Sequence, residues 1–146
     1  MCFFEEISIQ TLGRIELPLN SILENKDDKP VVLFTWSKGW CDPCIKSLDH
    51  FNENYYKKLR SKTGMKFIAL SLDQEKTNEE IKEFVIEKGW YFDVYQDTEG
   101  NFMRKLNRNS VPETFFIVNG RLKKHKYGFV EGLDNPEKTS KFIYDE

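Results

Sequence analysis

Short apolar runs alternate along the chain with amphipathic segments, an order typical of an α/β fold. Residues 31–36 (VVLFTW) are β-branched and aromatic, which predicts a strand buried on both faces. Apolar side chains then recur at helical spacing from Cys44 to Leu59, until Gly64 interrupts the pattern. Residues 66–72 predict the next buried strand. Because parallel strands need a long connection such as a helix, these segments indicate a parallel βαβ unit.

A second unit follows the first. Residues 77–80 have the form of a capping box, Thr-x-x-Glu, and Gly89 is placed to end the helix that this box begins. We expect a strand over residues 91–95, and then a short helix capped by Asp97 or Thr98. The second unit therefore continues the alternation of helices and strands.

Hairpins are predicted at both ends of the chain. The Asn-Gly pair at 119–120 can adopt the positive φ angles of a tight turn, so residues 121–129 should return antiparallel to residues 114–118. The lysines of this return strand are suited to protect an exposed edge. The remaining predicted elements are a hairpin of residues 7–9 and 14–17, a helical turn over residues 19–25 and a final helix over residues 137–144.

The composition fits a single domain spanning residues 1–146. The chain is 39% hydrophobic and 14% aromatic, which supplies enough apolar surface for one core. Its 24 acidic and 22 basic residues are mixed and leave a formal charge of -2, so we expect no nucleic-acid partner. No apolar run approaches the roughly 20 residues of a membrane span. Because the first residues read as the start of a folded domain, we expect that a targeting segment has been removed ahead of them.

The segment Trp40-Cys41-Asp42-Pro43-Cys44 carries the candidate chemistry, at a predicted strand-to-helix junction. Thiol–disulfide exchange needs an accessible thiolate that attacks a foreign disulfide, and a second thiol that resolves the mixed disulfide. At the mouth of the helix, the positive end of the helix dipole and unpaired N–H groups favour the thiolate of Cys41. Cys44, one turn deeper, joins the apolar stripe and should be less accessible. Pro43 suits the first helical turn.

Two other interpretations of the cysteine pair remain open. Such a pair is also half of a zinc site, but zinc normally takes four ligands, and Cys2, His50 and His125 lie at unrelated positions. Two inert buried thiols are the second alternative, since free cysteine is often buried. We expect instead a redox-active Cys41–Cys44 disulfide, with no metal and no other cofactor.

The motif and its surroundings resemble a known family. The Trp-Cys-x-x-Cys segment follows a hydrophobic strand, and residues 111–117 (VPETFFI) and an Asn-Gly hairpin lie far downstream. In this order and spacing, residues 7–129 look like a thioredoxin-like thiol–disulfide oxidoreductase of the TlpA/ResA type, which is similar to cytochrome c maturation proteins. The resemblance implies a thioredoxin-like fold with a central mixed sheet flanked by helices, an N-terminal hairpin and a helical insertion after the second core strand.

The resemblance also implies roles for residues around the pair. It implies a cis peptide bond before Pro112, a position opposite Cys41, and pairing of the Val111 backbone with a bound substrate chain. Trp36 and Trp40 would flank the site as an aromatic platform. Core packing is an equally good explanation of Trp36, since aromatic residues dominate protein cores.

The chain departs from the family pattern at the buried carboxylate that accepts or returns a proton during exchange. Thioredoxin carries an acid six residues before the first motif cysteine, where this chain has Thr35. The TlpA/ResA branch tends to carry a glutamate three residues after the second motif cysteine, where this chain has Ser47. The acids within reach are Asp42, between the cysteines, and Glu113, beside Pro112. Because Pro-Glu-Thr occurs in cytochrome-maturation relatives, Glu113 is the better candidate.

We therefore expect a monomeric thiol–disulfide oxidoreductase that reduces protein partners in the cell envelope, served by an envelope electron donor. The alternatives are a peroxiredoxin-like thiol peroxidase, a non-catalytic thioredoxin-like binding module and, for the compartment, the cytoplasm. We expect His50 and His125 to face solvent. Cys2 is interpreted as a residue without function, with a cloning remnant or a lipid-attachment residue as the alternatives.

Overall fold

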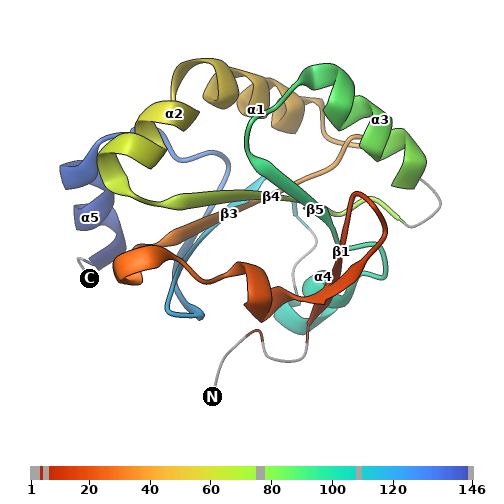
Figure 1. The fold of residues 1–146 in the computed structure, drawn as a ribbon, viewed down its shortest axis with the longest axis horizontal. Coiled ribbons are helices and arrows are strands. Elements are labelled where there is room, and N and C mark those ends of the chain that lie inside the picture. Colours follow the sequence, from red (N-terminus) through yellow and green to blue (C-terminus); the bar gives the residue numbers. More distant parts are fainter. Residues whose placement is uncertain (1–3, 5–6, 75–77, 108–109, 145–146) are drawn as a thin grey trace.

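A computed structural model of the chain describes residue 4 and residues 7–74, 78–107 and 110–144. A seven-stranded sheet in the order β2-β1-β5-β4-β3-β6-β7 forms its centre, with helices on both faces (Figure 1). The strands are β1 (Ser8–Thr11), β2 (Glu16–Pro18), β3 (Val31–Trp36), β4 (Lys66–Ser71), β5 (Asp93–Gln96), β6 (Glu113–Val118) and β7 (Arg121–Tyr127). The helices are α1 (Asp42–Asn54), α2 (Tyr56–Lys58), α3 (Asn78–Lys88), α4 (Asn101–Leu106) and α5 (Pro136–Tyr144), with short turns η1 (Leu19–Ile22), η2 (Lys26–Asp28) and η3 (Leu59–Thr63).

The sheet is mixed, as predicted. Strands β3, β4 and β5 pair in parallel, β6 pairs antiparallel with β3, and β7 pairs antiparallel with β6. The N-terminal hairpin of β1 and β2 joins the opposite side through antiparallel pairing of β1 with β5. Helix α3 is the predicted insertion after the second core strand. These features confirm the thioredoxin-like fold class.

The sheet separates two apolar clusters. Phe34 and Trp36 of β3 pack with helix α1 on one face, which we call the α1 face. Val31 and Leu33 pack into the second cluster on the opposite face. Because successive side chains of a strand point to opposite faces, Thr35 lies on the opposite face. All six residues of β3 are buried, as expected for a strand covered on both sides.

Glycines end two of the predicted helical segments. Gly64 follows η3 with a φ of 71°, and Gly89 follows α3 with a φ of 65°. This left-handed conformation is the usual end of a helix and costs glycine little. The position of Thr77 in the predicted capping box lies outside the described residues, as does that of Cys2.

The start of β5 differs from the prediction. The strand begins at Asp93 rather than at residue 91. The amide of Tyr91 donates to the side-chain oxygen of Asn52 on α1, over 2.8 Å, instead of joining the ladder. A contact with a distant helix therefore shortens the strand.

The cap of α4 also differs from the prediction. The N-cap residue is Gly100, and neither Asp97 nor Thr98 occupies that position. The carboxylate of Asp97 nevertheless accepts hydrogen bonds from the amides of Phe102 (3.0 Å) and Met103 (3.3 Å) in the first turn. Asp97 thus satisfies the free N–H groups of this helix from three residues before its cap.

Candidate active site

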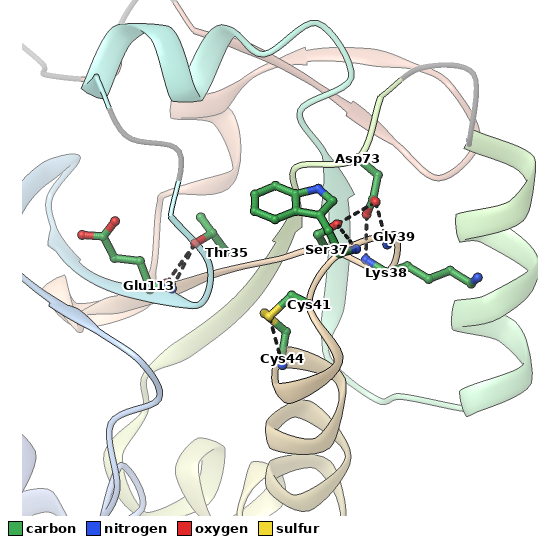
Figure 2. The surroundings of a disulfide bond; sticks show 9 residues. Thr35, Ser37, Lys38, Gly39, Cys41, Cys44, Asp73 and Glu113 are labelled. Carbon is green, nitrogen blue, oxygen red and sulfur yellow. Dashed lines mark hydrogen bonds between the residues drawn. A yellow bond between two sulfur atoms is a disulfide. The ribbon is translucent and has the colours of Figure 1, made fainter.

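The cysteine pair lies where β3 leads into α1 (Figure 2). Cys41 is the N-cap residue of α1, and its sulfur accepts a hydrogen bond from the amide of Cys44 over 3.2 Å. The two sulfurs form a disulfide with an S–S distance of 2.10 Å and a Cα–Cα distance of 5.4 Å. Asp42 and Pro43 occupy the first turn, where proline needs no N–H partner, and both are exposed.

The two sulfur-bearing residues differ in burial. Cys44 is fully buried in the apolar cluster of the α1 face, as predicted. Cys41 is 6% exposed, which is less than the open surface position that the sequence suggested. It is less exposed because it packs into the same apolar cluster as Cys44. The order of accessibility, with Cys41 outside and Cys44 inside, is the order that exchange requires.

The two tryptophans near the pair have different environments. Trp40, directly before Cys41, is 57% exposed. Trp36 is fully buried and lies against the rings of Trp90 (5.3 Å between centroids) and Phe84 (6.3 Å). Core packing therefore accounts for Trp36, and Trp40 alone of these two offers an aromatic surface beside the disulfide.

The peptide bond between Val111 and Pro112 is cis, as the family resemblance implied. Strand β6 begins directly after it and runs antiparallel to β3. The start of β6 therefore lies at the end of β3, where the loop to Cys41 begins. The carbonyl of Pro112 accepts a hydrogen bond from the amide of Gly128 over 2.8 Å. This bond ties the cis turn to the end of β7.

Glu113 is a buried carboxylate next to the position where thioredoxin has its acid. It pairs directly with Thr35 across β3 and β6, and the Thr35 hydroxyl accepts from the Glu113 amide over 3.1 Å. The Glu113 side chain is 1% exposed, and its Oε2 lies 3.0 Å from Nδ1 of His125. By strand alternation it lies on the face opposite the cysteines, and Figure 2 shows its carboxylate directed away from the disulfide.

His125 was expected to face solvent, and this expectation is wrong in part. Its side chain is 35% exposed, but one ring nitrogen contacts the buried Glu113. The lysine-rich sequence around His125 gave no sign of this contact, because it depends on which residue of β6 lies beside it. His50 does lie on the exposed side of α1, where it contacts Asn54 of the next turn.

Asp73 is a site residue that we did not predict. It lies two residues after the end of β4, is 6% exposed, and its carboxylate accepts hydrogen bonds from the loop that leads to Cys41 (Figure 2). A signal for it was present in the sequence, since an aspartate directly after a buried parallel strand lies at the carboxyl edge of the sheet, where sites of α/β folds are found.

A third acid, Asp49, joins α1 to the segment before β5. It accepts hydrogen bonds from the indole N–H of Trp90 (2.7 Å) and from Lys88 (2.8 Å). Ser47, at the family's position for a glutamate, lines a hollow of about 530 Å³ together with other residues of α1 and with Phe129. Among the described residues, no group of three or more His, Cys, Asp or Glu side chains is arranged to hold a metal ion.

Comparison with known protein families shows which family the chain belongs to. The model of the AhpC/TSA family matches residues 7–125, which is most of the chain. The chain belongs to the AhpC/TSA family. Within the part of this AhpC/TSA protein that the structure describes, no helix is both long and apolar enough to cross a membrane.

Relatives of this AhpC/TSA protein confirm the predicted resemblance to ResA. The thiol-disulfide oxidoreductase ResA of Bacillus thuringiensis subsp. konkukian is 34% identical over 97 residues, which are 65% of this chain and 53% of ResA. The chain thus spans about half the length of that relative. A thioredoxin-like protein from Porphyromonas gingivalis has a TM-score of 0.70 at 27% identity, covering 94% of this chain and 86% of its own. StoA from Bacillus subtilis has a TM-score of 0.67 at 21% identity, covering 91% and 95%.

Proposed function

We propose that this AhpC/TSA protein is a thiol–disulfide oxidoreductase that reduces disulfides of protein partners through Cys41 and Cys44. The observation that carries this proposal is the pair itself, with one slightly exposed cysteine at a helix N-terminus and a second, fully buried cysteine bonded to it. The name of the relative ResA supports the same chemistry.

The reaction is two successive exchanges. In the reduced protein, the Cys41 thiolate attacks one sulfur of the partner disulfide, so that a mixed disulfide forms and the first partner sulfur leaves as a thiolate. Cys44 then gives up its proton to the proton carrier, and its thiolate attacks the Cys41 sulfur, which closes the Cys41–Cys44 disulfide and releases the second partner sulfur as a thiolate. Two electrons pass from the protein to the partner, and the partner thiolates take up two protons.

The start of α1 supports the ionised form of Cys41. A helix N-terminus carries partial positive charge and unsatisfied N–H groups, both of which stabilise an anion. Here the amide of Cys44 points at the Cys41 sulfur. Cys44 has no exposed surface, so a foreign disulfide meets Cys41 first.

Neighbouring residues complete the proposed site. The family resemblance supports pairing of a bound chain with the backbone of Val111 beside the cis Pro112. Exposed Trp40 supplies an apolar contact next to the disulfide. Glu113, the better candidate for the proton carrier from the sequence, is fully buried, but its carboxylate lies on the face of the sheet opposite the cysteines and points away from the disulfide, so it could exchange a proton with the pair only through an intervening group. Asp42, which is exposed, is the weaker candidate.

The decisive experiment is to trap the intermediate. Cys44→Ser should accumulate a stable mixed disulfide through Cys41, and mass spectrometry of the captured proteins would identify the partners. The Cys41→Ser protein is the matched control and should capture nothing and lose reduction of insulin disulfides. If Cys44→Ser captures no protein in extracts of the source organism, the proposal is wrong. Rapid consumption of hydrogen peroxide that depends on Cys41 would favour the peroxidase alternative instead.

The proposed compartment is the cell envelope, and the proposed electron donor is an envelope dithiol protein. The resemblance to cytochrome c maturation proteins supports both. Fractionation of cells that produce the protein from its own gene tests the compartment, and recovery in the cytoplasmic fraction would contradict it.

A further inference from the structure

The carboxylate of Asp73 accepts hydrogen bonds from three donors of the loop that leads to Cys41 (Figure 2), and a fourth from Ser71 at the end of β4. Its Oδ1 accepts from the hydroxyl of Ser37 (2.8 Å) and from the amide of Gly39 (3.1 Å). Its Oδ2 accepts from the amide of Lys38 (3.0 Å) and from the hydroxyl of Ser71 (2.6 Å). Because Asp73 is 6% exposed, these donors take the place of water around its charge.

These contacts hold the whole connection between β3 and Cys41. The hydroxyl of Ser37 donates to Asp73 and accepts from the amide of Trp40 over 3.3 Å. The amides of three consecutive residues, 38–40, are therefore bonded to Asp73 directly or through Ser37. In a loop that belongs to neither strand nor helix, such partners decide which backbone conformation is stable.

The loop also approaches the carboxylate closely. A Cβ atom on Gly39 would lie 3.2 Å from Oδ1 of Asp73, which is tighter than an ordinary contact. Side chains larger than hydrogen at position 39 would push the loop away from its anchor. The close contact between the loop and the Asp73 carboxylate therefore depends on the lack of a side chain at Gly39.

We propose that Asp73 is a positioning residue for the redox pair: its carboxylate fixes the loop of residues 37–40, and thereby seats Cys41 at the N-cap of α1. This inference rests on the proposed exchange function. The sulfur of Cys41 is stabilised only where it faces the amide of Cys44, at the end of the helix dipole. Without the anchor the loop loses its fixed conformation, and Cys41 spends less time in the position from which it reacts.

The test compares two buried aspartates. In Asp73→Asn an NH2 group replaces one carboxylate oxygen and faces backbone or hydroxyl donors, which breaks part of the anchor. Asp97→Asn is the matched control, because Asp97 is also buried and also accepts two backbone amides, but at α4. We expect Asp73→Asn to slow insulin-disulfide reduction about ten- to a hundredfold, as misplaced reacting groups do, and Asp97→Asn to leave the rate within about twofold of wild type.

A second measurement separates positioning from a general loss of stability. The rate at which iodoacetamide alkylates Cys41 in the reduced protein reports the thiolate directly. Loss of the negative charge of Asp73 would by itself favour the thiolate and move the pH profile of this rate to lower pH, so a shift to higher pH in Asp73→Asn, which we expect, reports lost positioning. In Asp97→Asn we expect the profile to stay at the wild-type position. Ser71→Ala removes one donor from Asp73, keeps the carboxylate, and should show a smaller shift in the same direction.

The outcomes distinguish this inference from the proposed function. If wild type reduces insulin disulfides and Asp73→Asn matches Asp97→Asn in rate and alkylation profile, Asp73 only stabilises the fold and the inference is wrong. If wild type itself fails to reduce disulfides, the proposed function fails, while the alkylation profiles still show whether Asp73 positions Cys41. Should Asp73→Asn not fold, the profile of Ser71→Ala decides, and an unchanged profile overturns the inference.

Discussion

Several buried carboxylates lie at the carboxyl ends of the parallel strands, the end of the sheet near the cysteines. Asp73 and Asp97 follow neighbouring parallel strands, and each accepts backbone amides of the segment after a strand. Glu113 is buried at the start of β6, two strands from β4, beside Thr35 and His125. A buried acid is thus retained next to the position where thioredoxin has one, but it comes from β6 instead of β3.

The pH dependence of stability can be predicted at Asp97. Burial raises the pKa of its carboxyl above the ordinary value of 3.8, against the opposing effects of the amides of Phe102 and Met103 and the charge of Arg104. The folded state therefore holds this proton more tightly than the unfolded chain, and acidification favours the folded state at this site until the unfolded carboxyl is protonated too.

We expect Asp97→Asn to lack this contribution. The free energy of unfolding of wild type minus that of the variant should rise as the pH falls from about 7 to about 4, by about 1.4 kcal/mol for each unit by which the pKa is raised. Urea unfolding of both proteins across this range measures the difference, in which other groups cancel. A constant or falling difference would contradict the raised pKa.

At the scale of elements, short-range patterns explain why so much of the fold was predictable. The run of residues 31–36 is apolar throughout because both its faces are covered, and Gly64 and Gly89 end helical segments because each has a positive φ. The cysteine pair was recognisable because its chemistry depends on the spacing of two residues within one helical turn.

The remaining features of the site join residues that are distant in the sequence. Thr35 and Glu113 are 78 positions apart, and Lys38 and Asp73 are 35 apart. Their contacts depend on the register of strands and on the path of loops, which no local pattern determines. For the same reason the sequence left Glu113 as one of two candidates, and it gave no partner for His125.

The end of α3 allows a clean test of backbone strain. No atom lies within 4 Å of a Cβ built on Gly89, so Gly89→Ala adds no clash and leaves only the cost of a left-handed residue. We expect a loss of about 1 kcal/mol in the free energy of unfolding, and a smaller loss for Gly89→Asn. Gly13→Ala, at a glycine with no positive φ, is the control and should be nearly neutral. Equal effects at the two positions in urea unfolding would exclude strain as the cause.

For the molecule as a whole, the two free edges of the sheet differ in how they avoid pairing with other chains. At one edge β2 has three residues, too few for extended pairing. At the other, β7 has seven residues and carries Lys123, Lys124 and Lys126. Charge rather than length therefore protects the β7 edge.

Removing this protection should make the protein associate. We expect Lys123→Val with Lys126→Val to raise the apparent mass at high concentration in light scattering. The formal charge of -2 becomes more negative, so charge repulsion alone predicts the opposite result. Lys58→Val with Lys62→Val, two exposed lysines outside the sheet, makes the same change in charge and should leave the mass unchanged. If both pairs behave alike, the β7 lysines have no special protective role.

The order of the strands has a consequence for how the molecule opens. Strand β3, which leads into the cysteine helix, has β4 and β6 on its two sides and is at least two strands away from either border. Fraying that starts at a border loosens β2 or β7 long before it reaches β3. A molecule whose border strands have transiently frayed therefore keeps Cys41 and Cys44 in their positions at the end of β3.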